Sequence, residues 1–338
     1  MRPGDYSEDD VRIRAAKRKR PRSKQRPSHD DAVTGFVTGV DRGRYRVLLS
    51  GSAQPAQPTA ELPPVVAIKA RELGRGAIVV GDRVRVVGDV SGRPGSLARI
   101  VGVQPRRSEL TRTADDRDPI ERTIVANADQ LGIVVATTDP EPRPGFLDRA
   151  LVAAYDAGIR PLLLLTKADL SPTTEFLETY TPLDIPTFTA GTADDLTDLL
   201  VQLTDHETVL LGQSGVGKST LVNRLVPDAE RRTGHVNEVT GRGRHTSSSA
   251  IALPLPTGGW IVDTPGVRSF GLAHVDVDRI LEAFPRLQAA GAGCPRGCQH
   301  LPPDCALDDW IAGSGAPGDA ETLSCLRRII GSRLTEDY

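Results

Sequence analysis

Residues 212–219 are Gly-Gln-Ser-Gly-Val-Gly-Lys-Ser, the pattern G-x-x-x-x-G-K-S that is typical of a phosphate-binding P-loop. An apolar run at residues 208–211 precedes this stretch, and apolar residues at helical spacing follow it. The motif requires this order of strand, loop and helix. The alternative, a glycine-rich turn with no ligand, does not explain the flanking pattern. We therefore predict an α/β nucleotide-binding domain centred on this loop.

The chemistry of phosphate binding explains the residue types of the loop. Glycines allow backbone N–H groups to surround phosphate oxygens, and the helix N-terminus adds positive potential. Lys218 is expected to reach the β- and γ-phosphates, and Ser219 is expected to ligate Mg²⁺. The predicted nucleotide contacts are Gly212, Gln213, Ser214, Gly215, Val216, Gly217, Lys218, Ser219 and Thr220.

The composition is that of a globular protein. A chain of 338 residues suggests roughly two or three domains. It contains no apolar run of about 18 residues, the length that a membrane span needs. The charged N-terminus does not resemble a secretory signal, so we expect a cytoplasmic protein. Its four cysteines are then more plausible as thiols or metal ligands than as disulfides.

Charge is distributed unevenly along the chain. Residues 1–30 carry a net charge of +5, residues 31–107 carry +6, and residues 108–338 carry −13. Residues 1–30 contain too little apolar surface to offset the entropy of folding, which predicts a disordered basic arm. The alternative for this arm is a solubilising tail. A basic N-terminal third favours a polyanionic partner.

Residues 31–107 are predicted to form a small β-domain. Gly/Pro/Asp-rich turns separate its short strand-like runs, and residues 83–86 alternate between charged and apolar. This pattern favours an OB-type barrel that binds RNA, with an SH3-like barrel as the alternative. Aromatic residues are scarce, so RNA binding would depend on phosphate contacts. The predicted strands are 33–40, 45–49, 65–69, 83–87 and 97–103.

From residue 108 the pattern changes to alternating strands and helices, which predicts a mostly parallel sheet covered by helices. Thr166-Lys167-Ala168-Asp169 follows one predicted strand and matches the guanine-binding pattern [NT]-K-x-D. The Asp accepts two hydrogen bonds that guanine offers and adenine does not.

Residues 263–266, Asp-Thr-Pro-Gly, follow another strand and match D-x-x-G, where the Asp supports Mg²⁺ and the Gly senses the γ-phosphate.

The order of these motifs is unusual. In conventional GTPases the P-loop comes first, whereas here residues 166–169 precede it and residues 263–266 follow it. Such a circular permutation is compatible with domain termini that lie close together. The chain thus resembles the ribosome small-subunit-dependent GTPase A family of bacterial, circularly permuted GTPases. The resemblance covers about residues 33–338 and includes the segment Gly243-Arg244-His245-Thr246.

The resemblance implies further roles. Thr189-Ala190 is similar to the family's S-A element, whose backbone N–H contacts guanine O6. Residues 243–246 resemble the switch I motif, in which Thr246, or alternatively Ser247, would reach Mg²⁺ together with Ser219 and Asp263. Thr166 departs from the family's usual Asn, and its shorter side chain should replace only part of the Asn contacts.

A cluster of possible metal ligands lies near the C-terminus. The pattern C-x₃-C-x-H-x₄-C is formed by Cys294, Cys298, His300 and Cys305. Four such ligands suit one structural, tetrahedral Zn²⁺; the alternative is thiols that are close by chance. The family's spacings are one residue longer at both gaps. We expect residues 274–338 to form an α-helical zinc-binding domain after a GTPase domain at residues 108–273, with Cys325 in its core.

The expected activity is hydrolysis of GTP to GDP and phosphate, with Lys218 and Asp263 in the catalytic site and Gly266 near the γ-phosphate. Val267 stands where many GTPases have a water-orienting Gln, so we expect slow turnover without a partner. We hypothesise that His245 orients the water; packing of switch I or contact with rRNA is the alternative. The resemblance implies that the 30S subunit and its 16S rRNA are the partners of a monomeric protein.

Two other functional classes fit part of these patterns. A P-loop ATPase or small-molecule kinase requires Thr166–Asp169 to match the guanine pattern by accident. A zinc- and RNA-binding scaffold with an inactive GTPase is disfavoured because Lys218, Ser219 and Asp263 are all present.

Overall fold

The computed structural model describes residues 29–50, 64–74, 77–113, 121–171, 175–227, 229, 250–264, 272, 275–303 and 305–332. The chain divides into two compact units, Met1–Asp31 and Ala32–Tyr338, and every helix and strand described below belongs to the second. The predicted basic arm at residues 1–30 lies almost entirely outside the described residues. Within the described residues, no helix is long and apolar enough to cross a membrane.

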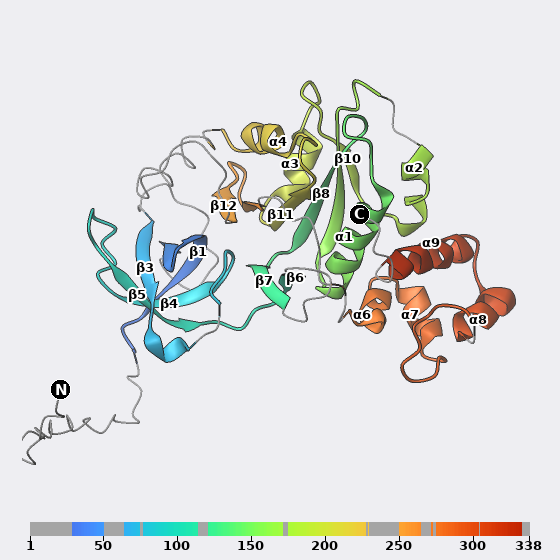
Figure 1. Ribbon diagram of the computed structural model, residues 1–338, viewed down its shortest axis with the longest axis horizontal. Helices are drawn as coiled ribbons and strands as arrows, with labels where there is room; N and C mark the ends of the chain where they lie inside the picture. The colour runs from blue at the N-terminus through green and yellow to red at the C-terminus, as the bar shows by residue number, and fades with distance from the viewer. Residues whose placement is uncertain are drawn as a thin grey trace, which may run out of the picture. The chain divides into compact units, whose positions relative to one another are not determined.

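Five strands form a closed barrel near the start of the second unit (Figure 1). They pair in the order β1-β2-β3-β5-β4, and β4 pairs again with β1 to complete the circle. Only the β3–β5 pair is parallel. This is an OB-type barrel, as predicted. The strands are β1 (Val33–Asp41), β2 (Arg44–Leu49), β3 (Val65–Lys69), β4 (Arg83–Gly88) and β5 (Ala98–Val103), with a 3₁₀ turn, η2 (Arg71–Leu73), after β3.

Alternation along β4 determines which residues fill the barrel. Val84 and Val86 are fully buried in the core, whereas Arg85 is exposed on the outer surface. Successive side chains of a strand point to opposite faces, so the alternating sequence places one apolar face inward. The barrel interior therefore has the composition that the sequence pattern predicts.

A two-stranded antiparallel hairpin follows the barrel and was not predicted. It consists of β6 (Glu109–Thr113) and β7 (Glu121–Ala126). Its strands are mostly Thr, Arg and Glu, and apolar side chains such as Leu110 and Val125 supply its buried contacts. So few apolar positions give a weak period-2 signal, which explains why sequence analysis predicted the α/β pattern directly from residue 108.

The next six strands form the predicted sheet, in the order β10-β9-β8-β11-β13-β12. All neighbours are parallel except β12, which runs antiparallel to β13. A single pairing of Gly39 with Ile251 joins β1 to β12, so barrel and sheet are continuous. The strands are β8 (Gln130–Ala136), β9 (Arg160–Thr166), β10 (Thr187–Thr189), β11 (Glu207–Gly212), β12 (Ile251–Pro254) and β13 (Trp260–Asp263).

Helices cover both faces of this sheet (Figure 1). Leu162 and Leu164 of β9 pack with α3 (Thr197–Leu203) and α4 (Lys218–Leu225), whereas Leu163 and Leu165 pack on the opposite face with α1 (Pro144–Asp156). The run of four leucines is thus buried on both sides, as expected for an inner parallel strand. Two short elements, α2 (Glu175–Glu178) and η3 (Thr181–Leu183), connect β9 to β10.

Four helices form the C-terminal part: α6 (Val277–Glu282), α7 (Pro285–Gly291), α8 (Ala306–Ser314) and α9 (Asp319–Gly331). Helices α6 and α9 pack against α1. Arg328 of α9 forms a partly buried ion pair with Asp148 of α1, and Tyr180 donates a hydrogen bond to the same carboxylate at 2.7 Å. Cys325 is buried, as predicted. The predicted domain boundaries at residues 31, 108 and 274 remain a prediction.

Candidate functional site

The P-loop connects β11 to α4, as the sequence motif predicts. Gly217 precedes the helix with a φ of 89°, a left-handed conformation that glycine adopts without strain. Gly212 ends β11 so close to β8 that a Cβ atom there would lie 2.9 Å from the Val134 carbonyl oxygen. These two glycines therefore allow the loop to turn tightly at the carboxyl end of the sheet, where ligands bind in open α/β folds.

Lys218 and Asp263 meet at this end of the sheet. Their Nζ and Oδ1 atoms form an ion pair at 2.8 Å, and Lys218 also donates a hydrogen bond to the carbonyl oxygen of Thr264. The Thr264 hydroxyl in turn donates to the Leu210 carbonyl at 2.8 Å, which fixes the end of β13 against β11. The structure thus places the P-loop lysine and the D-x-x-G aspartate in one site.

The donor set at this site suits Mg²⁺. Ser219 is exposed in the first turn of α4, and the Asp263 carboxylate is only partly buried at the end of the neighbouring strand. Hydroxyl and carboxylate oxygens are the hard ligands that Mg²⁺ prefers beside phosphate. Thr246, the third predicted ligand, lies outside the described residues, as do His245, Gly266 and the remainder of Gly243–Thr246.

Thr166 holds the guanine-binding segment against the P-loop. Its buried hydroxyl donates a hydrogen bond of 2.5 Å to the carbonyl oxygen of Val216. The next residue, Lys167, donates to the Asp139 carbonyl oxygen, and its own carbonyl accepts from Thr137 at 2.7 Å. Thr166 therefore makes a direct contact between the two motifs, although it is shorter than the Asn that the pattern usually contains.

The loop after β10 lies beside Asp169. A Cβ atom at Gly191 would be 3.3 Å from an Asp169 carboxylate oxygen. The backbone N–H of Ala190 donates to the Leu165 carbonyl at 2.6 Å and so continues the β9–β10 ladder. In this structure the amide that the S-A resemblance assigns to guanine O6 is thus already hydrogen-bonded, and the roles of Thr189 and Ala190 in base binding remain a prediction.

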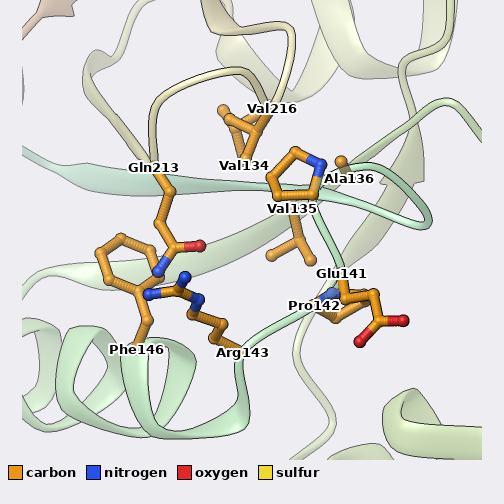
Figure 2. Close-up of a pocket in the computed structure, with 10 residues that line it drawn as sticks. Val134, Val135, Ala136, Glu141, Pro142, Arg143, Phe146, Gln213 and Val216 are labelled. Carbon is orange, nitrogen blue, oxygen red and sulfur yellow. The ribbon is translucent and has the colours of Figure 1, made fainter. Parts of the chain in front are cut away.

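A small pocket adjoins the P-loop on its α1 side (Figure 2). The Gln213 side chain lines this pocket together with Arg143 and Phe146 from the start of α1, as Figure 2 shows. The Gln213 side chain therefore forms part of the wall of this pocket. The other lining residues are Val134, Val135, Ala136, Pro140, Glu141, Pro142 and Val216.

The predicted metal ligands also converge. One ligand atom from each of Cys294, Cys298, His300 and Cys305 lies within 4.8 Å of all the others. The sulfur atoms of Cys294 and Cys305 are 3.8 Å apart, and Nδ1 of His300 is 3.9 Å from the Cys305 sulfur. Two sulfur ligands at about 2.3 Å from a tetrahedral Zn²⁺ lie roughly 3.8 Å from each other. The Cys294–Cys305 pair thus has the spacing of a tetrahedral zinc site, and the four residues are close enough to hold one metal ion together.

Neighbouring charged groups orient these ligands. Nε2 of His300 contacts the Asp278 carboxylate of α6 at 2.9 Å, which leaves Nδ1 facing the cysteines. Arg327 donates to the His300 carbonyl oxygen at 2.8 Å. Burial opposes ionisation of Cys305, but hydrogen bonds, the largest from His300, lower the pKa of its thiol overall. A lower thiol pKa favours the thiolate that binds metal.

Several residues of these sites were missed by sequence analysis. Arg224 and Asp194 fix the loop beside Asp169, and Asp278 and Arg327 surround the metal cluster. Each lies outside the sequence motifs, and an isolated Asp or Arg on a helix or loop is usually only a solvated surface residue. Spatial proximity alone identifies them.

The motif geometry and strand order define a circularly permuted P-loop GTPase. A family model described as RsgA GTPase matches residues 103–273. Proteins named small ribosomal subunit biogenesis GTPase RsgA are similar: that of Ectopseudomonas mendocina (strain ymp) is 39% identical over 274 residues, covering 78% of this chain and 77% of its own. That of Pseudomonas putida (strain F1) is 41% identical over 273 residues, with the same coverage.

Two solved structures share the fold. YjeQ from Thermotoga maritima superposes with a TM-score of 0.58 at 22% identity, over 89% of this chain and 99% of that one. YloQ, described as a circularly permuted GTPase, gives 0.59 at 22% identity, over 93% and 100%. The family model and the relatives at 39–41% identity show that the chain belongs to the RsgA GTPase family. The protein is a GTP-hydrolysing enzyme.

Proposed function

We propose that this GTPase acts in maturation of the small ribosomal subunit, binds the 30S particle and its 16S rRNA, and hydrolyses GTP faster when bound. The observation that carries the proposal is the similarity, at 39–41% identity over 78% of the chain, to proteins named as small ribosomal subunit biogenesis GTPases. The conjunction of an OB-type barrel with a permuted GTPase fold supports it.

The nucleotide site supports a guanine-specific reaction. Asp169 is proposed to accept hydrogen bonds from guanine, with Lys167, Ala168, Thr189 and Ala190 completing the base site. Lys218 and the backbone N–H groups of the P-loop would neutralise charge on the phosphates during in-line attack by water. Mg²⁺, held by Ser219 and Asp263 with Thr246, supplies further charge neutralisation when bound.

The Lys218–Asp263 ion pair indicates that these two side chains change partners when nucleotide binds. Both side chains are expected to act on the nucleotide, yet they bind each other at 2.8 Å in this structure. Binding of nucleotide with its cation must therefore exchange the ion pair for phosphate and metal contacts.

The attacking water still needs a polar partner, which we assign to His245 in the presence of the 30S subunit.

The barrel supports contact with RNA through phosphates. Residues 31–107 carry a net charge of +6, and Arg85 and Arg99 are exposed on neighbouring strands β4 and β5. Its two aromatic residues, Phe36 and Tyr45, are 5% and 7% exposed and so are not available for base stacking. Arginine contacts to phosphate give affinity with little sequence specificity.

The C-terminal helices are proposed to form a domain around one structural Zn²⁺ held by Cys294, Cys298, His300 and Cys305. Structural zinc supplies folding free energy to a small domain that has little core of its own. We propose domains at residues 31–107, 108–273 and 274–338 in a monomeric protein. Ribosome assembly would place it in the cytoplasm.

The decisive experiment measures GTP hydrolysis by the purified full chain with and without 30S subunits. We expect slow hydrolysis alone and a large increase with 30S, and little increase with the same concentration of 50S subunits. Binding of 30S should be tighter with a non-hydrolysable GTP analogue than with GDP. An equal rate under all conditions, with no co-sedimentation, would reject the ribosomal role and leave the GTPase assignment intact.

A further inference from the structure

Arg224 joins the phosphate-binding helix to the base-binding loop. It lies in the last turn of α4, the helix that begins at Lys218, and is half-buried. Its Nη1 donates to the Gly191 carbonyl oxygen, and its Nη2 donates to the Asp194 carbonyl oxygen at 2.5 Å. One guanidinium thus holds both ends of the turn at residues 191–194.

The same turn is closed by its own carboxylate. Asp194 Oδ2 accepts a hydrogen bond from the Gly191 backbone N–H at 2.7 Å, and the Asp194 N–H donates to the Gly191 carbonyl at 3.3 Å. The turn lies against Asp169, because a Cβ atom at Gly191 would be 3.3 Å from an Asp169 oxygen and 3.1 Å from an Asp194 oxygen. A displacement of the turn would therefore alter the space around Asp169.

We propose that Arg224 is a positioning residue for base selection: it fixes the 191–194 turn, and through it Asp169, to the helix that carries Lys218. The inference rests on the proposed role of Asp169 in binding guanine. Arginine suits this task because its planar fork makes two directed hydrogen bonds, whereas a lysine ammonium offers a point charge. The base and phosphate sites are thereby held in one fixed geometry before nucleotide arrives, which lowers the ordering cost of binding.

Thr166 provides the second connection of the same kind. Its hydroxyl holds residues 166–169 to the P-loop, while Arg224 holds residues 191–194 to the helix after that loop. The first connection holds the segment that contains Asp169, and the second holds the turn that lies beside Asp169. Arg224 thus supplements the contact with the Val216 carbonyl that Thr166 makes in place of the usual Asn.

The test compares Arg224→Ala and Arg224→Lys with the unaltered full chain in binding of GDP and IDP. Inosine lacks the 2-amino group of guanine. The dissociation constant of IDP divided by that of GDP therefore measures how strongly a carboxylate recognises guanine. We expect Arg224→Ala to weaken GDP binding about tenfold and to bring the ratio toward one. Arg224→Lys should fall between, and Arg279→Ala, at an exposed position of α6, should change neither value.

A purely structural role would weaken GDP and IDP equally, leave the ratio unchanged, and so overturn the inference. Arg224→Lys supplies the ratio if Arg224→Ala does not fold, which its melting temperature will show. Asp169→Ala separates the two hypotheses. If it leaves the ratio unchanged, the proposed guanine site itself is wrong; if it lowers the ratio and the Arg224 variants do not, only the role of Arg224 is wrong. A double variant should show little loss beyond Asp169→Ala alone.

Discussion

Arg83 of the barrel forms an ion pair with Glu207, the first residue of the strand that leads to the P-loop. Arg107 lies 3.7 Å from the same carboxylate, and Arg83 also stacks over the Phe36 ring at 4.3 Å. Phe36 in turn contacts Trp260, the first residue of the strand that ends at Asp263, with ring centroids 4.7 Å apart. The barrel therefore packs against the starts of the two strands whose other ends carry the nucleotide motifs.

The burial of Glu207 predicts a dependence of stability on pH. Desolvation raises the pKa of Glu207 to about 7, although Arg83 and Arg107 act in the opposite direction. A carboxyl group with a raised folded-state pKa stabilises the fold most below its ordinary pKa, and this contribution is lost as pH rises to about 7. Arg83→Ala should therefore cost little at pH 5 and about 1.4 kcal/mol more at pH 8, because the ionised carboxylate loses the nearer of its two arginine partners.

Chemical denaturation between pH 5 and 8 measures this effect. Adding Glu207→Gln to Arg83→Ala should remove the pH dependence, because the amide cannot ionise. Arg85→Ala, at the next outward position of β4, serves as the control and should change stability by less than about 0.5 kcal/mol. A cost of Arg83→Ala that is independent of pH would show that Glu207 does not titrate in this range.

Removal of the Thr166 hydroxyl should weaken nucleotide binding. Thr166→Val keeps the side-chain volume but leaves the Val216 carbonyl without its donor, at a cost of about 1–3 kcal/mol. Since Val216 belongs to the P-loop, we expect roughly tenfold weaker GDP binding by calorimetry. Thr204→Val, which also removes a hydroxyl-to-carbonyl bond but lies at the end of α3, should leave GDP affinity unchanged. Equal affinity of both variants would mean that the contact does not support the loop.

Exchange of the base-binding carboxylate should change nucleotide preference. Asp169→Asn replaces an acceptor by a side chain that also donates, which suits the 2-oxo group of xanthine. We expect GTP affinity to fall by a factor of 10² or more and xanthosine triphosphate to become the preferred ligand. Competition binding with both nucleotides checks this, with Asp198→Asn on the exposed face of α3 as the control. Unaltered preference for GTP would place the base elsewhere.

The Asp278 carboxylate should contribute to metal affinity through His300. Asp278→Ala removes the contact that fixes Nε2 and leaves the ring free to present either nitrogen to the metal. Loss of such a partner typically costs about 10–100-fold in metal affinity, and chelator competition with Zn²⁺ measures it. Asp309→Ala, an exposed acid of α8, is the control. Cys298→Ala removes a ligand and should abolish zinc binding. A wild-type chain that is fully folded without metal would contradict a structural role for zinc.

The catalytic role of His245 predicts a specific kinetic pattern. If its neutral imidazole orients water, His245→Ala should lower 30S-stimulated kcat by roughly 10²-fold and leave GTP affinity nearly unchanged. His206→Ala, at the start of β11 and so at the opposite end of the sheet from the P-loop, should have no such effect. Normal maximal turnover with weaker 30S binding would assign His245 to docking instead.

Sequence alone determined the class of this protein because its chemistry depends on short contiguous motifs. A P-loop, a T-K-A-D segment, a D-T-P-G segment and a Cys₃His cluster each require particular residues at fixed local spacing. The order of the first three along the chain is enough to indicate the permutation. The barrel strands were predicted to within one residue at each end because turns rich in Gly and Pro bound them. Signals of this kind lie within short contiguous segments, so they can be recognised in the sequence alone.

The isolated charged residues that support those motifs are recognisable only in the folded chain. Arg224 lies 33 residues from Gly191, Arg83 lies 124 from Glu207, and Asp278 lies 22 from His300, and no local pattern marks these pairs. The polar hairpin β6–β7 was missed for the related reason that its strands bury too few apolar side chains to produce a period. Contacts between distant segments depend on how the chain closes its sheets, and that information is absent from the spacing of residues along the sequence.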